Sequence, residues 1–287
     1  MRPGPRVPDG IVTCGLPAGE DPEDLYGELC ASVRWEDVGK GRRGAVLTRM
    51  DAAGGVPLVR TTTRYGSPAQ RFGAVHERLA RRVQEAAGVP VGFNNALVER
   101  YADAYRRMGA HCDQALDLEE GPGSFIALFS CYRSAGAGPL RKLVFEEKGE
   151  RGEKGEKGEG GGGFEVELRH NGVVAFSVEA NRRFRHRILL DASSPAGEDE
   201  WLGVTFRTSR TLVRFRDGHA YLPDGERLAV AGEEQAREFY GLRRRENQET
   251  DFRYPPLAYT VSESDLVPPV RWVCGFPQCG FTTPCGH

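Results

Sequence analysis

The sequence has no long apolar run and almost no excess of charge of either sign. No window of its 287 residues approaches the ~20 apolar residues that a membrane helix needs. The first residues, MRPGPRVPDG, contain no apolar stretch typical of a signal peptide. The formal net charge is −2, from 39 Lys and Arg against 41 Asp and Glu, which excludes a strongly polybasic protein. These absences predict a soluble intracellular protein, in the nucleus or the cytoplasm, with no membrane partner.

Lysine is scarce, since 34 of the 39 basic residues are arginine. Arginine recognises carboxylates and phosphates in a bidentate manner, but a coding bias predicts the same excess, so both explanations stay open. The seven cysteines are odd in number and scattered, which argues against a secreted disulfide framework. With 39% hydrophobic residues, the chain is able to bury a full core.

Composition divides the chain into three expected parts. Residues 1–55 are interpreted as a loop-rich N-terminal extension, residues 56–246 as a folded domain and residues 247–287 as a C-terminal extension. Within the domain, residues 148–163 repeat glycine every third position without proline, so we expect a disordered loop rather than a collagen helix. The tail carries four zinc-type ligands at spacings of no common knuckle, so metal binding and an unstructured tail both remain open: Cys274, Cys279, Cys285 and His287.

Hydrophobic spacing predicts both helices and strands. Apolar residues at helical intervals predict helices over residues 73–88, 95–108 and 233–245. Short β-branched and aromatic runs predict strands over residues 124–131, 140–145, 164–168, 173–178, 185–190 and 203–215. Many short strands at this spacing are typical of a sandwich or barrel. We therefore expect a mainly β fold with flanking helices (α+β).

Two histidines and an aspartate suggest a metal site. His111 and Asp113 are two residues apart, and along a strand this spacing points both side chains to the same face. His186 lies 73 residues after Asp113 on another predicted strand. Two imidazoles and one carboxylate on one face of a metal form the facial triad of non-haem Fe(II) oxygenases. Arg207, on a later strand, offers the guanidinium fork that the carboxylate of an organic co-substrate needs.

Several ordered segments around these residues resemble the AlkB-like 2-oxoglutarate- and Fe(II)-dependent dioxygenases. The matching segments are VPLVRTTTRYGSPAQRF (56–72), FNNALVERYADAYRRMGAHCDQALDL (93–118), GSFIALFS (123–130), RHNGVVAFSVEANRRFRHRI (169–188) and WLGVTFR (201–207). The resemblance covers residues 55–220 approximately. It implies a double-stranded β-helix, or jelly roll, which agrees with the run of short predicted strands.

The resemblance also implies roles for individual residues. His111, Asp113 and His186 would bind Fe(II), with no catalytic residue beyond this metal centre. Tyr101 would donate a hydrogen bond to 2-oxoglutarate, and Arg207 would pair with one of its carboxylates.

The register of Arg207 is ambiguous. If VTFR matches the family's LTFR, Arg207 is the second of two expected arginines and Trp201 takes the place of the first. If residues 207–209 form an R-x-S motif, Arg207 is the first, Ser209 assists it and Val213 replaces the second. One arginine is missing either way, and Arg210 or Arg214 is available as a substitute.

A second departure from the family concerns a carboxylate. Glu99 stands where the family pattern has asparagine, and it would repel 2-oxoglutarate unless it points away.

The implied reaction consumes O2 and 2-oxoglutarate and oxidises a substrate C–H bond, which for an N-methyl group yields formaldehyde and the free base. Arg64 and Tyr65 match a lid that holds a flipped nucleobase. The arginines at 182–185 would meet phosphates or form a solvated turn. We expect demethylation of alkylated nucleobases in DNA or RNA, presented as a single strand or a flipped base, without an obligate protein partner. Hydroxylation of a protein or small molecule, and a non-catalytic binding module, are the alternatives.

Overall fold

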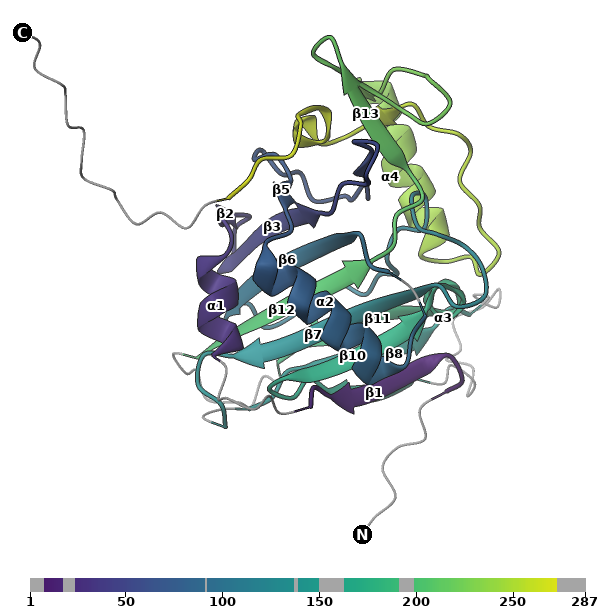
Figure 1. Cartoon of the computed structure of the whole chain (residues 1–287). Coiled ribbons are helices and arrows are strands. Elements are labelled where there is room, and N and C mark those ends of the chain that lie inside the picture. Colours follow the sequence, from purple (N-terminus) through teal and green to yellow (C-terminus); the bar gives the residue numbers. More distant parts are fainter. Residues whose placement is uncertain are drawn as a thin grey trace, which may run out of the picture.

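Two β-sheets form the centre of the computed structural model, which describes residues 8–17, 24–90, 92–136, 139–149, 163–190 and 199–272 (Figure 1). The larger sheet has eight strands, in the order β1 (Ile11–Gly15), β10 (Gly172–Ser177), β7 (Phe125–Tyr132), β12 (Glu200–Arg207), β6 (Asn95–Ala102), β3 (Arg42–Thr48) and β2 (Glu36–Asp37), with β5 (Gln70–Arg71) beside β3. The smaller sheet consists of β11 (Phe184–Leu189), β8 (Lys142–Glu147) and β9 (Gly163–Glu167). Most of the expected Gly-rich loop and the cysteine tail lie outside the described residues.

The large sheet buries both of its faces. Its outer face packs against α1 (Leu25–Ala31) and α2 (Ala74–Ala87), the helix that crosses the sheet in Figure 1. Its inner face packs against the small sheet, with Tyr101 and Trp201 in the same cluster as Phe145 and Ile188. Two antiparallel sheets packed face to face around such a core form a jelly roll. The expected mainly β fold class is therefore confirmed.

Helix α2 forms as the sequence predicts. Leu79, Val83 and Ala87 recur at intervals of four and are buried against the sheet. The helix begins after Gly73, whose backbone N–H donates to the Nδ1 atom of His76 at 2.9 Å. It ends at Gly88, which adopts a positive φ of 63° that favours glycine.

The predicted helix over residues 95–108 is wrong, because residues 95–102 form strand β6. Ala96, Leu97 and Tyr101 recur at helix-like spacing, but β6 pairs along its whole length with β3 on one side and β12 on the other. A central strand that is covered on both faces is buried almost continuously, so the sequence does not show the alternation of apolar and polar residues that marks a half-exposed strand.

The N-terminal segment is part of the jelly roll, whereas the sequence predicted a loop-rich extension outside it. Strand β1 pairs with β10, β3 pairs with β6 and β2 pairs with β3, so the described part of residues 1–55 supplies three strands of the large sheet. Turn residues such as Gly39, Lys40 and Gly41, all with positive φ, separate these strands and produced the loop-like composition.

The remaining elements lie beyond one end of the two sheets. The expected strand over residues 203–215 is two strands, since β12 ends at Arg207 and β13 (Leu212–Arg216) begins after the irregular residues 208–211. Strand β13 pairs with β4 (Val56–Pro57) and β14 (His219–Tyr221), and β15 (Ala229–Val230) pairs with β16 (Tyr259–Thr260). Three further helices are α3 (Val178–Arg183), α4 (Glu233–Glu246) and the 3-10 helix η1 (Glu263–Leu266). Among the described helices, none is long and apolar enough to span a membrane.

Candidate metal centre

The structure brings His111, Asp113 and His186 together at the edge of the small sheet. His111 forms an antiparallel bridge with His186 of β11, through backbone N–H···O bonds of 2.9 and 2.7 Å in the two directions. The bridge places the two imidazole centroids 4.8 Å apart. One potential ligand atom from each of the three residues lies within 4.8 Å of the others. The H-x-D spacing and the distant histidine thus meet at one point.

The backbone of Asp113 is held by Asn181 of α3. The backbone N–H of Asp113 donates to Oδ1 of Asn181 at 2.8 Å, and Nδ2 of Asn181 donates to the carbonyl of Asp113 at 2.7 Å. Asn181 is itself buried. Sequence reasoning missed this residue, because Asn181 stands among the charged residues of VEANRR and nothing in the local pattern singles it out.

The Asp113 carboxylate carries a negative charge that its surroundings stabilise. Its Oδ2 accepts from Nε of Arg207 at 2.7 Å, and its Oδ1 lies 3.5 Å from Nε2 of His186. Burial alone would raise the pKa of Asp113, but the Arg207 guanidinium and His186 outweigh burial and hold the pKa well below its usual range. A metal would therefore meet an ionised carboxylate at neutral pH.

His111 is poised as a neutral ligand. Burial and the neighbouring His186 lower the pKa of His111 to about 4. Its Nδ1 lies 2.9 Å from the carbonyl of Gly109, which only accepts, so Nδ1 carries the proton and the lone pair of Nε2 is free. Two imidazoles and a carboxylate that converge in this way fit an Fe(II) ion with a facial donor set.

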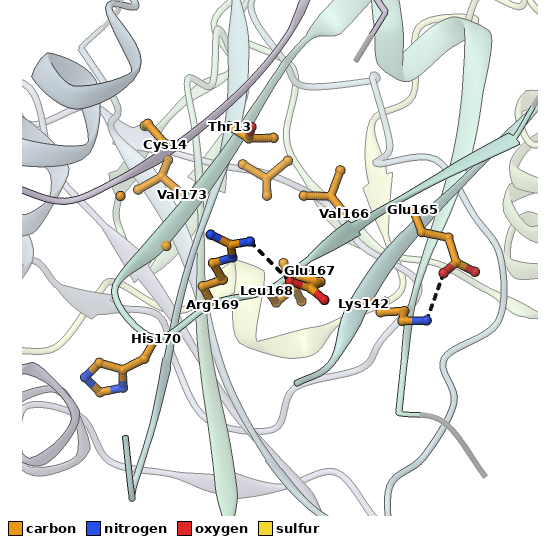
Figure 2. A pocket seen from close by; sticks show the side chains of 13 residues that line it. Thr13, Cys14, Lys142, Glu165, Val166, Glu167, Leu168, Arg169, His170 and Val173 are labelled. Carbon is orange, nitrogen blue, oxygen red and sulfur yellow. Dashed lines mark hydrogen bonds and ion pairs between the residues drawn. The ribbon is translucent and has the colours of Figure 1, made fainter. Parts of the chain in front are cut away.

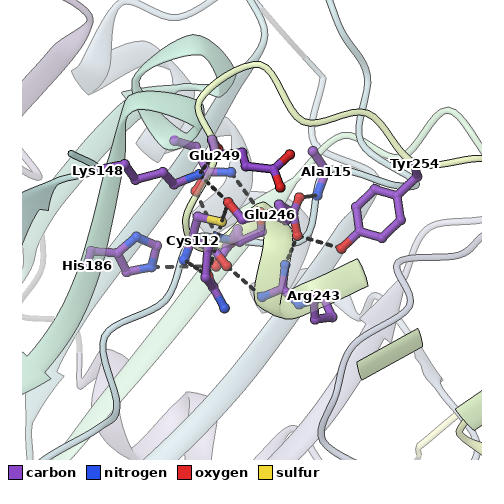
Figure 3. A network of polar contacts seen from close by, with 11 residues as sticks. Cys112, Ala115, Lys148, His186, Arg243, Glu246, Glu249 and Tyr254 are labelled. Carbon is purple, nitrogen blue, oxygen red and sulfur yellow. Dashed lines mark hydrogen bonds and ion pairs between the residues drawn. The ribbon is translucent and has the colours of Figure 1, made fainter. Parts of the chain in front are cut away.

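The C-terminal turn of α4 holds the loop that bears His111 and Asp113 (Figure 3). The side chain of Asn247 accepts from the backbone N–H of Cys112 at 2.9 Å, and Nη2 of Arg243 donates to the Cys112 carbonyl at 2.8 Å. Oε1 of Glu246 accepts from the backbone N–H of Ala115 at 2.8 Å. Asp113 is therefore bracketed on both sides by contacts from one helix end.

The same helix end is itself tied to neighbouring segments. Glu246 forms a buried ion pair with Arg243 and accepts from the hydroxyl of Tyr254 at 2.6 Å. Nζ of Lys148 donates to the Glu246 carbonyl at 2.7 Å, so the start of the expected Gly-rich loop contacts the last turn of α4. The expected polar helix over residues 233–245 thus has a buried end that supports the metal loop.

The residues expected to bind 2-oxoglutarate are engaged by groups of the protein. The hydroxyl of Tyr101 donates to Oε2 of Glu99 at 2.8 Å. Arg207 directs its Nε to Asp113, as described above. The hydroxyl of Ser209 donates to the Leu58 carbonyl and accepts from the backbone N–H of Thr211. These side chains therefore contact one another and the backbone, and their role in binding 2-oxoglutarate stays a prediction.

The two candidate substitute arginines lie elsewhere. Arg210 is exposed and donates to the Leu116 carbonyl, and Arg214 is exposed and donates to the Ala53 carbonyl. The cation that does lie beside Glu99 is Arg42 of β3, whose Nη1 is 3.7 Å from Oε1 of Glu99. Sequence reasoning missed Arg42, because its segment had been interpreted as an extension outside the domain.

The residues expected to receive a nucleobase do not form a stacking surface. Arg64 is exposed, whereas Tyr65 is only 5% exposed and its ring lies over Gly44 in the interior. The arginines around His186 form ion pairs with glutamates that offset only part of their charge: Arg182 with Glu120, Arg183 with Glu147, and Arg185 and Arg187 with Glu146.

Two cavities lie away from the triad. The first, of about 710 Å³, lies between β1, β9 and β10, with Glu165, Glu167 and Arg169 on its polar side (Figure 2). The second, of about 480 Å³, is lined by Ala115, Phe252 and Tyr254 among others. Neither includes His111, Asp113 or His186 in its lining.

Comparisons with known proteins add little to this geometry. No family model matches the chain, and no curated protein matches it. Among solved structures, a prolyl-4-hydroxylase from Pseudomonas putida matches with a TM-score of 0.36 and 12% identity, over 69% of this chain and 92% of that chain. A similarity at this level decides nothing about function, so function has to be argued from the site.

Proposed function

We propose that the protein is an Fe(II)-dependent oxygenase that uses a 2-oxo acid as co-substrate, with 2-oxoglutarate as the acid that the sequence resemblance implies. The observation that supports this proposal is the convergence of His111, Asp113 and His186 between two sheets of a jelly roll. This donor set occupies one face of a metal and leaves the opposite face for ligands.

Each neighbouring residue has a defined task in this proposal. A ferrous ion held there supplies the binding of O2 and the oxidation of a C–H bond. His111, Asp113 and His186 would hold the ion, and Asn181 orients the backbone of Asp113. Arg207 stabilises the charge of Asp113. The rings of Phe145 and Phe176, with centroids 6.0 and 5.2 Å from that of His186, exclude water from one side of the site.

Within this chemistry, the first substrate class to test is the alkylated nucleobase, as the resemblance implies. The burial of Tyr65 favours the second class, a C–H bond of a protein or small molecule. Both classes require the same metal centre, so they share one test of activity.

The experiment is to load the protein with Fe(II) in the absence of O2, add a 2-oxo acid and O2, and measure CO2 release together with bound iron. We expect His111→Ala and His186→Ala each to lose iron binding and CO2 release, while His219→Ala, on the distant strand β14, retains both. Retained iron binding in both triad variants would overturn the proposal. Mass spectrometry of methylated oligonucleotides and of peptides then separates the substrate classes.

A further inference from the structure

A buried carboxylate lies on the inner face of the large sheet, near the metal centre. Glu99 of β6 is 8% exposed, and its direct neighbours across the strands are Gly44 of β3 and Gly203 of β12. The space above both glycines is filled by aromatic rings. A Cβ atom on Gly44 would lie 2.6 Å from the hydroxyl of Tyr65, and one on Gly203 would lie 2.2 Å from the indole of Trp201. Glu99 therefore lies between the aromatic rings of Tyr65 and Trp201, which we call the aromatic wall.

This carboxylate already uses the groups that a ligand carboxylate would need. Oε2 of Glu99 accepts from the hydroxyl of Tyr101, and Oε1 lies 3.7 Å from Nη1 of Arg42. The Tyr101 ring packs edge-on against Tyr105, with centroids 4.7 Å apart, and at a tilt against Trp201, at 4.9 Å, which restricts its movement. A second carboxylate arriving here would meet a like charge in place of a free donor.

Glu99 also faces the charges of the metal centre. Burial raises the pKa of Glu99, the Arg42 and Arg207 guanidinium groups oppose that rise, and the Asp113 carboxylate adds to it. Asp113 and Arg207 are thus close enough to Glu99 for their charges to interact with it. On β12, Trp201, Gly203 and Arg207 point to the same face, since strand side chains alternate. The residues around Glu99 therefore lie on the face of β12 that also carries Arg207, the partner of Asp113.

Two donors of this wall have no hydrogen-bond partner among the described residues. The indole Nε1 of Trp201 and the hydroxyl of Tyr65 are buried and make no hydrogen bond to any residue that the structure describes. An unpartnered buried donor is costly unless a ligand or water satisfies it. A neutral or weakly polar ligand tail fits this combination of rings and free donors, whereas an anionic tail conflicts with Glu99.

We propose, resting on the proposed function, that Glu99 is a built-in carboxylate that selects a 2-oxo acid with an uncharged tail over 2-oxoglutarate. The ligand class is a monocarboxylic 2-oxo acid, such as 2-oxobutyrate, whose tail packs against Trp201. Glu99 is the specificity-determining residue, and Tyr101 and Arg42 hold it in place.

The test is an anaerobic titration of the Fe(II)-loaded protein, because chelation of Fe(II) by a 2-oxo acid produces a visible absorption band. We expect wild-type protein to bind 2-oxobutyrate about tenfold or more tightly than 2-oxoglutarate. Glu99→Gln keeps an acceptor for Tyr101 and removes the charge, so it should strengthen 2-oxoglutarate binding by about tenfold or more and leave 2-oxobutyrate nearly unchanged. Glu165→Gln, at the exposed pair with Lys142 on β9, is the matched control and should behave as wild type.

Other results separate the two proposals. Wild-type protein that binds 2-oxoglutarate at least as tightly as 2-oxobutyrate overturns the inference, and this comparison needs no variant. An unchanged preference in a folded Glu99→Gln protein also overturns it, as does iron-loaded protein that gives no band with either acid. Failure to bind iron, measured by metal content, rejects the metal centre and hence the proposed function itself.

Discussion

Two buried arginine–aspartate pairs, four residues apart along the chain at Asp117 and Asp113, are built in different ways. Nε and Nη2 of Arg60 donate hydrogen bonds to the carboxylate of Asp117, at 3.0 and 2.8 Å. Its Nη1 donates to the carbonyls of Leu257 and Tyr259. Arg207 contacts Asp113 through Nε alone, and the second oxygen of Asp113 faces His186. The first pair is saturated by the protein, whereas the second leaves an oxygen and an imidazole for a ligand.

The number of open hydrogen-bonding positions distinguishes a structural pair from a pair at the metal centre better than burial does. The side chains of Arg60 and Asp117 are 4% and 0% exposed, and those of Arg207 and Asp113 are 8% and 6% exposed, so burial hardly distinguishes them. What differs is the number of hydrogen-bonding positions still open. We therefore expect the Arg60 pair to act on stability alone and the Arg207 pair to couple stability to metal binding.

The largest effect is expected from Arg60→Met. The substitution leaves the Asp117 carboxylate buried without its cation, which should lower the free energy of unfolding by about 3–5 kcal/mol. Urea denaturation measures this loss. Arg64→Met, at an exposed position in the same segment, is the control and should change stability by less than about 0.5 kcal/mol. A loss equal to that of the control would contradict the structural role.

Arg207→Met should have a smaller effect that depends on metal. Only one N–H···O bond is lost and Asp113 keeps His186 beside it, so we expect a loss of about 2 kcal/mol without metal. A divalent ion would replace the missing positive charge. Co(II), as a stand-in that does not react with O2, should therefore stabilise Arg207→Met more than wild type by about 1–2 kcal/mol. Thermal unfolding with and without Co(II) measures this increment.

The comparison fails if metal stabilises both variants equally. Arg60→Met should gain the same increment from Co(II) as wild type, because Asp117 has no open oxygen for a metal. An equal gain in Arg207→Met and Arg60→Met would show that Arg207 is as purely structural as Arg60.

Local sequence patterns predicted the elements whose conformation depends on interactions between residues close together in the chain. Helix α2 followed from apolar spacing and two glycine boundaries, and the short strands from β7 to β11 followed from their β-branched and aromatic runs. The spacing of two between His111 and Asp113 predicted that these side chains share one face of an extended segment, but their meeting with His186 depends on a bridge between distant segments. For the helix and the strands, the interactions that decide the conformation lie within a few residues.

What the sequence did not reveal depends on strand pairing. Strand β6 has a helical apolar spacing, and only its two sheet neighbours make it extended. Arg42 reaches Glu99 because β3 pairs with β6, a contact between residues 57 positions apart. Asn181 and the end of α4 act on Asp113 through backbone contacts, which leave no side-chain motif to find. Long-range register decided these features, and one sequence alone does not specify register.

A further predicted effect concerns Asp265, next to the saturated pair. Burial raises the pKa of Asp265 to about 7, Thr260 and Arg60 oppose the rise, and Asp117 adds to it. Because the pKa is raised in the folded state, the stability that this group contributes is full below about pH 4 and is lost as the pH rises through 7. Between pH 5 and 7, wild type should lose about 2 kcal/mol relative to Asp265→Asn, as measured by urea denaturation at each pH. Parallel pH profiles would show that Arg60 still compensates Asp265, and the pair would then not be saturated.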